Sequence, residues 1–307
     1  MSAGGSLVGA ALKGALLADG ILVESGVPGL YQRSEVFESV VRGVESAARS
    51  AARYVGGFEP LRFLPPIMPR ETFVKTGYLR SFPDLIGSVE TFEGGDAEHA
   101  ALLRTADAGG DWTQALSPSE VTLCSAACHS LYPHLAGTLG AGGRYLELQG
   151  FCFRHEPSPD PVRMQSFRMH ELVHVGTPSS AVAHRDAWLE RGLRTLRDLG
   201  LPVEPVVAND PFFGRAGRML AANQRATELK YEIVCAVTST EKPTAIASAN
   251  YHEDHFGSPF GILAEDGSPA HSACFGFGLE RVALALFAVH GLHPGGWPAE
   301  VRDRLRP

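Results

Sequence analysis

The chain has 307 residues, of which 44% are hydrophobic and 20% are charged, and its formal net charge is -7. This composition is typical of an ordinary globular protein and excludes a disordered or fibrous one. The negative charge counts against a general nucleic-acid binder, which is usually basic. No apolar run is long enough to span a membrane.

The cysteine pattern indicates a reducing compartment, because an odd number of cysteines without a CxxC pair forms no disulfide framework. They are Cys124, Cys128, Cys152, Cys235 and Cys274. The apolar segment Leu7–Val23 contains Lys13 and Asp19 and lacks a clear cleavage site, so it does not match a signal peptide. We therefore expect a cytoplasmic protein.

The first third of the chain predicts two helices and a strand. We expect residues 1–6 to be disordered and Ala10–Leu22 to form a short helix. Apolar residues at helical spacing predict an amphipathic helix over Arg33–Arg53, and the apolar run Leu61–Leu64, which prolines follow, predicts a strand. The acidic, glycine-rich segment Glu93–Gly110 is expected to be a surface excursion.

The centre of the chain predicts a long hairpin. Tyr145–Glu156 and Met164–Val175 alternate as strands do, and a proline-rich loop joins them. Phe167 and Glu171 have the same parity, so they should face the same side. Two arginines, two carboxylates and one aromatic ring would then converge on one sheet face, a set that suits a nucleotide.

The remaining segments alternate between helix and strand. Thr177 and Pro178 are typical of a helix start. Helices are expected at 178–199, within 209–229 and at 279–290, and strands at 201–207, 229–237, 244–250 and 273–277. Strands in hairpin-like succession with helices between them favour an α+β fold with an antiparallel sheet. We see no repeat and no linker, so we expect a single domain over residues 1–307.

Three segments resemble the motifs of class II aminoacyl-tRNA synthetases. The letters FRHE at Phe153–Glu156 and RMQSFRMHE at Arg163–Glu171 resemble motif 2, closest to the seryl type. The segment FGFGLER at Phe275–Arg281 resembles motif 3, and the helix and proline-ended strand within 33–66 resemble motif 1. The whole chain is most similar to the amino acid:carrier-protein ligases, which are seryl-synthetase-like catalytic domains without the tRNA-binding part.

This resemblance covers roughly 16–291 and implies a class II synthetase-like antiparallel sheet flanked by helices. It implies that the chain activates a small amino acid, glycine or alanine, with ATP as an aminoacyl-adenylate. The acyl group would then pass to the phosphopantetheine thiol of an acyl or peptidyl carrier protein. It also implies a homodimer, a catalytic zinc ion, and Mg²⁺ bound with ATP.

The resemblance also gives roles to single residues. Arg154 would contact the α-phosphate of ATP and the carboxylate of the amino acid, and Arg281 would hold the γ-phosphate, so both are expected to be catalytic. Glu156 would accept from the adenine amine, and Phe167 would stack on the ring. The other residues assigned to the ATP site are Arg163, Met164, Glu232 and Ser248. Thr244 stands where the seryl pattern has a glutamate, so the magnesium ligands stay open.

The zinc ligands implied by the resemblance are Cys128, Glu171 and Cys274. Three protein ligands leave one tetrahedral position open, as catalytic zinc requires. The rival interpretation is that both cysteines are buried and free.

A second metal pattern overlaps the first. His170-Glu171-Leu172-Val173-His174 matches HExxH, which gives a zinc hydrolase as an alternative function. The pattern works on a helix, where positions i and i+4 share one face. On a strand the two histidines are four steps of ~3.3 Å apart, too far to share one zinc ion. Because the segment predicts a strand, we interpret the match as chance.

Two further alternatives are a truncated synthetase paralogue that charges tRNA and a catalytically inactive binding subunit. The resemblance leaves no segment for a tRNA-binding arm, so tRNA is not the expected partner. The predicted helix at 178–199 has a basic side, which is a candidate docking surface for an acidic carrier protein. Its arginines are Arg185, Arg191, Arg194 and Arg197.

Overall fold

A computed structural model describes residues 7–9 and 11–306, so the expected disorder of residues 1–6 lies outside the described residues. The main sheet consists of β3 (Arg62–Leu64), β8 (Arg144–Phe153), β9 (Ser166–Gly176), β10 (Val203–Val207), β11 (Lys230–Cys235), β12 (Thr244–Glu253) and β14 (His271–Gly278). Within the described residues its order is β10-β11-β12-β14-β9-β8-β3. Neighbouring strands are antiparallel except for the parallel edge pair β3 and β8.

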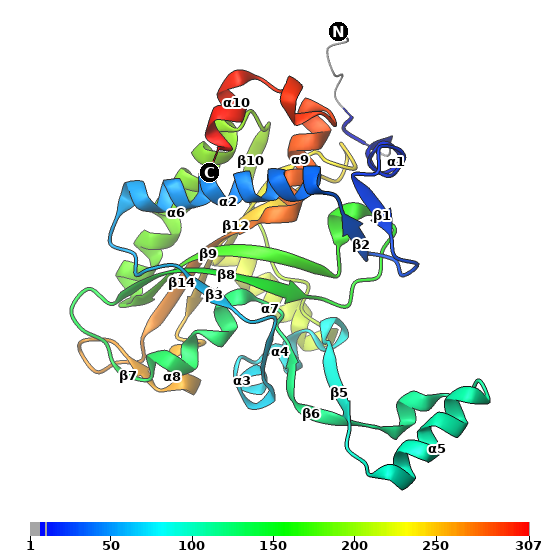
Figure 1. The fold of residues 1–307 in the computed structure, drawn as a ribbon. Helices are drawn as coiled ribbons and strands as arrows, with labels where there is room; N and C mark the ends of the chain where they lie inside the picture. Colours follow the sequence, from blue (N-terminus) through cyan, green and yellow to red (C-terminus); the bar gives the residue numbers. More distant parts are fainter. Residues whose placement is uncertain (1–6, 10, 307) are drawn as a thin grey trace.

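Three long helices cover one face of this sheet (Figure 1). They are α2 (Glu35–Val55), α6 (Pro178–Asp198) and α9 (Leu279–His290), and the short α10 (Ala299–Arg304) packs beside them. The main hydrophobic core lies between these helices and the sheet, and Trp188, Phe275 and Phe287 are fully buried in it. The expected antiparallel sheet flanked by helices is therefore confirmed.

Helix α2 shows why the sequence folds locally as expected. The Ser34 hydroxyl accepts a hydrogen bond from the Phe37 backbone N–H at 3.2 Å, which caps the first turn and contributes about 1 kcal/mol. Gly56 ends the helix with φ 72°, a conformation that favours glycine. Phe37, Val40 and Val44 face the core, so the apolar spacing of the sequence predicted the correct side.

The central hairpin pairs β8 with β9 over ten residues, from Arg144 opposite Val175 to Phe153 opposite Ser166. Strand β8 ends at Phe153, so the expected strand Tyr145–Glu156 was too long by three residues. Beyond that point the chain enters the proline-rich loop, which contains the 3-10 turn η5 (Pro161–Arg163) and cannot continue a ladder.

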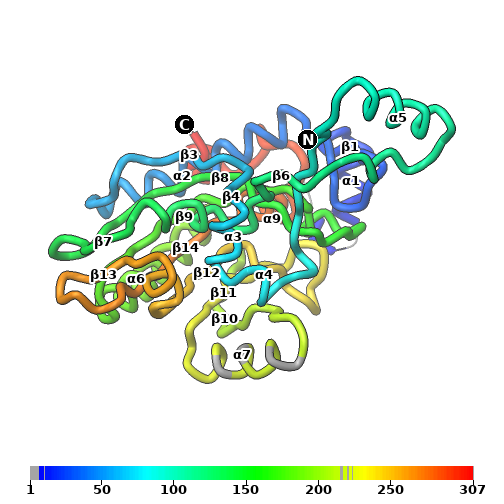
Figure 2. The backbone as a smooth tube through the Cα atoms, turned by 90° about the horizontal axis from the view of Figure 1, so that it is seen from below, coloured from blue at the N-terminus to red at the C-terminus, as the bar shows by residue number. Residues whose placement is uncertain are grey.

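Shorter elements lie on the opposite face of the sheet (Figure 2). They are α3 (Arg70–Lys75), α4 (Tyr78–Ser81), η1 (Pro83–Leu85), η3 (Ala127–Ser130), η4 (Tyr132–Leu135), α7 (Gly214–Ala226) and α8 (Gly257–Phe260). The rings of Phe82 and Phe212 stack at 5.2 Å, and the Phe213 N–H donates to the Ser81 carbonyl at 2.8 Å. These contacts join the end of α4 to the segment before α7.

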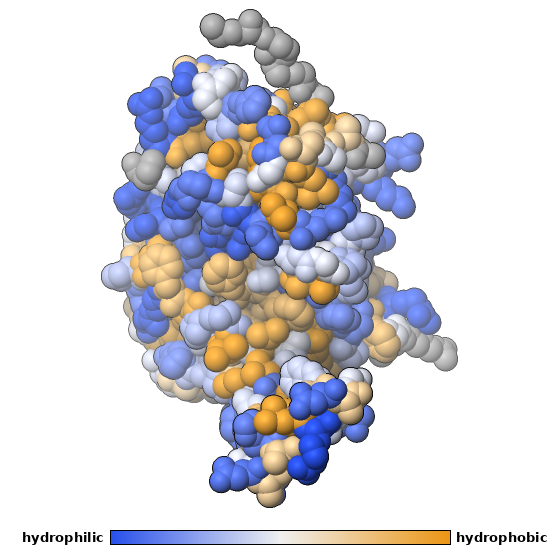
Figure 3. Space-filling view, turned by 45° about the vertical axis from the view of Figure 1, so that its right-hand side comes forward, coloured by the Kyte–Doolittle hydropathy of each residue, from blue (hydrophilic) through white to orange (hydrophobic). Residues whose placement is uncertain are grey.

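An arm stands away from the body at the bottom of Figure 3 and mixes hydrophilic and apolar side chains. It contains β5 (Ser88–Phe92), α5 (Asp96–Asp107), η2 (Trp112–Ala115) and β6 (Leu116–Leu123), and β4 (Ile67–Pro69) pairs with β6 at its base. The expected surface excursion at 93–110 therefore contains a helix, α5, in which no residue is buried. Because α5 has no buried face, the sequence has no apolar stripe that would predict it.

The remaining described elements are small. They are α1 (Ala11–Ala18), β1 (Leu22–Glu24), β2 (Tyr31–Arg33), β7 (Gly137–Thr138), β13 (Ile262–Leu263) and η6 (Pro294–Gly296). Strands β1 and β2 form a hairpin that precedes α2 in the chain, and β7 pairs with β13.

Candidate active site

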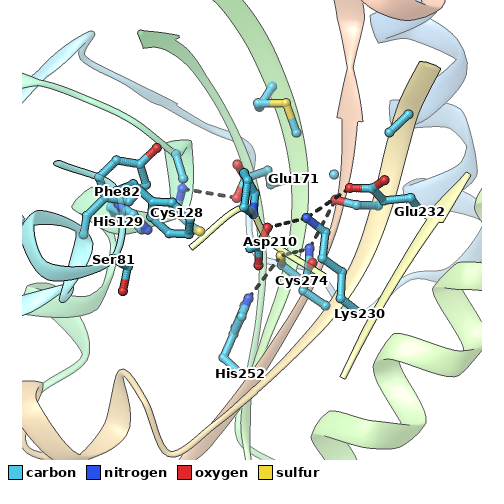
Figure 4. Close-up of a pocket in the computed structure, with 18 of the residues that line it drawn as sticks. Ser81, Phe82, Cys128, His129, Glu171, Asp210, Lys230, Glu232, His252 and Cys274 are labelled. Atoms are coloured by element: carbon cyan, nitrogen blue, oxygen red, sulfur yellow. Dashed lines mark hydrogen bonds and ion pairs between the residues drawn. The ribbon is translucent and has the colours of Figure 1, made fainter. Parts of the chain in front are cut away.

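A cavity of about 450 Å³ lies on the face of the sheet away from α2, α6 and α9. Most residues that the sequence assigned to the site line it. They are Cys128, Arg154, Glu156, Phe167, Glu171, Glu232, Ser248, Cys274 and Arg281. Their elements are far apart in sequence, so this convergence is a result of the fold. Figure 4 shows Cys128, Glu171, Glu232 and Cys274 around one space.

Strand register explains the convergence. One cross-strand row runs from Glu232 through Ser248 and Gly276 to Glu171, and all four line the cavity. A Cβ atom on Gly276 would lie 2.7 Å from Cε of Met169. A larger residue there would have to displace Met169, so the glycine keeps the floor of the cavity open.

The next row places a lysine and a cysteine on the same face. Lys230 pairs with Asn250, and Asn250 pairs with Cys274. The Asn250 amide donates to the Cys274 sulfur at 3.3 Å and to the Ser248 hydroxyl at 3.2 Å. This amide therefore ties the cysteine row to the serine of the neighbouring row.

Two partly buried arginines face the cavity from different elements. Arg281, in the first turn of α9, donates to the carbonyls of Val162 at 2.9 Å and Ala245 at 3.0 Å. Burial, together with repulsion from Arg154, lowers the pKa of Arg281 to about 10, so it is still cationic at neutral pH. Arg154 donates to the Ser125 carbonyl at 3.3 Å, and its guanidinium carbon lies 5.4 Å from the centre of the Phe167 ring. Two partly buried cations that donate only to carbonyl groups favour a bound anion.

Two residues assigned to the ATP site lie outside the cavity lining. Arg163 is on its rim, with 56% of its side chain exposed, and pairs with Glu156 at 3.2 Å. Met164 is buried in the main core and does not line the cavity.

The three residues implied as zinc ligands lie together. The Glu171 carboxylate accepts the backbone N–H groups of Ala127 and Cys128, each at 3.2 Å. The neighbouring Cys128 thiol lowers the pKa of Cys274, and burial raises the pKa of Glu171 to about 7. Among the described residues, no three His, Cys, Asp or Glu side chains are arranged as a metal site. The Glu171 oxygens face backbone amides, so the three residues converge without forming a coordination shell.

The sequence did not single out several residues that the cavity contains. Lys230 lies between Asp210 and Glu232, with its ammonium group 3.1 Å from the Glu232 carboxylate and in contact with Asp210 (Figure 4). Burial alone would lower the pKa of Lys230, but the two carboxylates raise it above its usual value. Lys230 and Glu232 are two positions apart on β11, so strand alternation was the sequence feature that could have placed them on one face.

Two further lining residues are the histidines His129 and His252. His252 places Nε2 3.5 Å from the Cys274 sulfur and Nδ1 3.0 Å from the Ser272 hydroxyl. His129 lies between the rings of Tyr78 and Phe256, and burial lowers the pKa of His129 to about 3. Neither histidine belongs to a recognisable sequence motif, so only the structure brings them to the site.

The structure contradicts the zinc-hydrolase alternative. His170 and His174 lie on strand β9, not on a helix, and face away from Glu171. His170 contacts the Glu147 carboxylate at 3.1 Å, and His174 contacts the Ser180 hydroxyl at 2.8 Å. The two histidines therefore have separate partners and do not share a metal with Glu171.

The basic side of α6, which the sequence indicated as a candidate docking surface, is only partly exposed. Arg185 is buried, donates to the Glu228 carbonyl and packs over Tyr231. Arg191 packs over Trp188, and Arg194 pairs with Glu190 at 3.0 Å. Arg194 and Arg197 remain exposed on α6, so a docking surface there stays a prediction.

Comparisons with known proteins give the family. The chain is 44% identical over 291 residues to amino acid–[acyl-carrier-protein] ligase 1 of Bradyrhizobium diazoefficiens, a match that covers 94% of this chain and 88% of that protein. The chain belongs to the amino acid–[acyl-carrier-protein] ligases. It is therefore a ligase. The alternative of a catalytically inactive binding subunit does not agree with this family. No protein-family model matches it.

This ligase is also similar to seryl-tRNA synthetases. It is 26% identical over 280 residues to the type-2 serine–tRNA ligase of Methanopyrus kandleri, covering 81% of this chain but only 51% of that protein. The solved complex of A. aeolicus tRNASec with M. kandleri seryl-tRNA synthetase matches with a TM-score of 0.80 at 21% identity, over 96% of this chain and 60% of the matched chain. The fold is therefore that of the class II synthetases.

A second solved structure, seryl-tRNA synthetase from Pyrococcus horikoshii complexed with ATP, matches this ligase with a TM-score of 0.70 at 14% identity. The match covers 98% of this chain and 63% of that one. No described helix of the ligase combines the length and apolarity that crossing a membrane requires.

Proposed function

We propose that this ligase activates a small amino acid, glycine or alanine, with ATP and transfers it to the phosphopantetheine thiol of a carrier protein. A carboxylate oxygen of the amino acid attacks the α-phosphorus of ATP, and pyrophosphate leaves. The thiol sulfur then attacks the acyl carbon of the adenylate and loses its proton, and AMP leaves. No protein nucleophile is needed, because the adenylate is already an activated mixed anhydride.

The observation that carries the proposal is the pair of partly buried arginines, Arg154 and Arg281, that line the cavity. Among the described residues, no carboxylate forms an ion pair with either guanidinium, and both donate to carbonyl groups instead, so a triphosphate would supply the missing negative charge. Phe167 and Glu156 line the same cavity, and the Phe167 ring lies 5.4 Å from the Arg154 guanidinium carbon, so the two suit the adenine ring and its amine. The relative named as a carrier-protein ligase and the ATP-bound synthetase of the same fold support this choice of substrates.

Magnesium is proposed to accompany ATP beside Glu232 and Ser248, which lie opposite each other on β11 and β12. Glu232 now contacts Lys230, so its carboxylate would be shared with, or released from, that lysine when the cation binds. Oxygen ligands of this kind suit Mg²⁺, which keeps several of its waters.

Zinc is proposed to be held by Cys128, Glu171 and Cys274. Two thiols and a carboxylate are ordinary zinc ligands, and all three groups are buried beside the cavity. When bound, the ion would supply a Lewis acid for the neutral α-amine of the substrate. Because the Glu171 carboxylate accepts the backbone amides of Ala127 and Cys128, it would exchange one of these hydrogen bonds for the ion.

A homodimer is proposed to form through α2 and the edge strand β3. Phe63 on β3 is 68% exposed and Tyr54 near the end of α2 is 88% exposed. Large apolar side chains at an unpaired sheet edge favour burial against a partner.

The transfer step is tested with a carrier protein prepared with and without its phosphopantetheine arm. The ligase, ATP and glycine or alanine are incubated with each form, and the carrier mass is measured. The proposal expects one added aminoacyl group on the armed form only, released by hydroxylamine as a thioester. Equal labelling of the form without the arm would contradict it.

A further inference from the structure

Four charged side chains form a closed ring behind the cavity, on the helix-covered face of the sheet. Arg33 of β2 contacts Glu38 and Glu280, each at 2.9 Å. Arg168 of β9 contacts Glu38 of α2 at 2.8 Å and Glu280 of α9 at 2.7 Å. We call this set the arginine–glutamate ring. Its charges alternate and cancel, so it is neutral as a whole.

The ring is largely removed from water. The exposed fraction of the side chain is 2% for Glu280 and 14% for Arg168, and it is 20% for Arg33 and 22% for Glu38. Glu280 also accepts the backbone N–H of Arg168 at 2.7 Å, so it holds both the main chain and the side chain of β9. Removal of one partner from such a buried set leaves a charge uncompensated.

The ring residues are the immediate neighbours of two residues in the proposed ATP site. Arg168 follows Phe167 on β9, and alternation sends their side chains to opposite faces of the sheet. Glu280 precedes Arg281 in the first turn of α9, and Arg281 lines the cavity while Glu280 faces the ring. The ring therefore ties together, from behind, the two elements that present Phe167 and Arg281.

We propose that Arg168 and Glu280 are positioning residues that fix the Arg281 guanidinium relative to the Phe167 ring, with Arg33 and Glu38 anchoring the pair to α2. This inference rests on the proposed function, in which Phe167 receives adenine and Arg281 receives the γ-phosphate. A hydrophobic cluster could hold the same elements together, but it would not fix their separation as directional, charge-assisted hydrogen bonds do.

The geometry gives the inference a specific signature. ATP reaches both Phe167 and Arg281, whereas AMP reaches the base-binding end and lacks the γ-phosphate. A change in the separation of the two residues should therefore weaken ATP binding and leave AMP binding nearly unchanged. A residue that only stabilises the fold would not distinguish the two nucleotides.

The test measures ATP and AMP binding to the full-length protein by calorimetry for wild type, Glu280→Gln and Glu38→Gln. Glu280→Gln should weaken ATP binding about tenfold or more, the size expected for a lost charge-assisted bond, with AMP binding changed less than about twofold. Glu38→Gln, at the more exposed side of the ring, should show the same pattern to a smaller degree and serves if the first variant does not fold.

Glu35→Gln is the matched control. Glu35 lies on α2, as Glu38 does, and its side chain is 80% exposed beside Arg42. It should bind both nucleotides as wild type does. Folded variants that bind ATP as tightly as wild type, or that lose ATP and AMP affinity by the same factor, would overturn the inference alone. A wild-type protein that binds no ATP would overturn the proposed function, and the inference with it.

Discussion

At the scale of single residues, the cysteines separate by environment rather than by sequence. All five are buried and free, yet only Cys128 and Cys274 line the cavity beside Glu171. Cys235 is equally buried but lies in the main core. Cys128 and Cys274 thus differ from Cys235 in what surrounds the sulfur and not in its exposure to solvent.

Replacement of Cys274 by serine is expected to remove bound zinc, because only two of the three proposed ligands remain. Metal content per chain, measured after dialysis, should be about one zinc for wild type and close to none for Cys274→Ser. Cys235→Ser is the control and should retain the metal. Retention of stoichiometric zinc by the Cys274 variant would show that the site is assigned wrongly.

The motif residues could be predicted from sequence because each lies on a strand or at a strand–helix junction whose local pattern is strong. The alternation of β9 placed Phe167 and Glu171 on one face, as the cavity shows. The partners Asp210 and Lys230 could not be found this way, because they meet only when the loop before α7 folds over β11. The ring of Arg33 and Glu280 was equally hidden, since it joins positions 247 residues apart.

At the scale of elements, packing of helix α6 on the sheet depends on one small residue. A Cβ atom on Gly192 would lie 2.0 Å from Cζ of Phe275, a fully buried ring of β14. The helix can approach the sheet this closely because position 192 has no side chain.

Gly192→Ala is therefore expected to destabilise the protein, although alanine favours helix by about 1 kcal/mol. Overpacking should lower the free energy of unfolding by about 1–3 kcal/mol, measured by denaturant titration. Gly14→Ala, in helix α1 with nothing within 4 Å of the new atom, is the matched control and should be neutral or stabilising. A Gly192 variant as stable as the Gly14 variant would contradict this packing.

Helix α6 also buries a titratable group against the sheet. His184 contacts the Leu172 carbonyl at 3.0 Å and packs beside Trp188. Burial lowers the pKa of His184 from 6.5 to about 4. The unfolded chain thus takes up a proton at a higher pH than the folded chain does, so stability is present above pH 6.5 and is lost as pH falls toward 4.

Between about pH 7.5 and about pH 5, His184 should reduce the free energy of unfolding by about 2 kcal/mol. The comparison is denaturant unfolding of wild type and His184→Gln at both pH values, which cancels the contribution of the carboxylates. The variant should lose less stability over this interval. Equal losses in the two proteins would contradict a buried, neutral histidine.

At the scale of the whole molecule, class II architecture could be recognised from three motifs, but the arm around α5 could not. Its helix has exposed residues on every side, so neither apolar periodicity nor a motif marks it. The strand boundary at Phe153 was missed for a related reason: alternation continues into Arg154 and Glu156, although the ladder has already ended.

The proposed dimer gives a prediction at this scale. Phe63→Asp places a charge on the exposed edge strand β3 and should convert a dimer to a monomer in sedimentation experiments, because burying that charge is costly. Phe92→Asp is the control, since Phe92 is also exposed but lies on the arm. A wild-type monomer, or a Phe63 variant that stays dimeric, would contradict the proposed interface.

The central claim is that this cavity activates a small amino acid with ATP. The most direct measurement is amino-acid-dependent exchange between ATP and labelled pyrophosphate, made with each of the standard amino acids on zinc-loaded protein. We predict exchange with glycine or alanine that is abolished by Arg281→Ala. An absence of exchange with every amino acid, or exchange that survives loss of Arg281, would contradict the account.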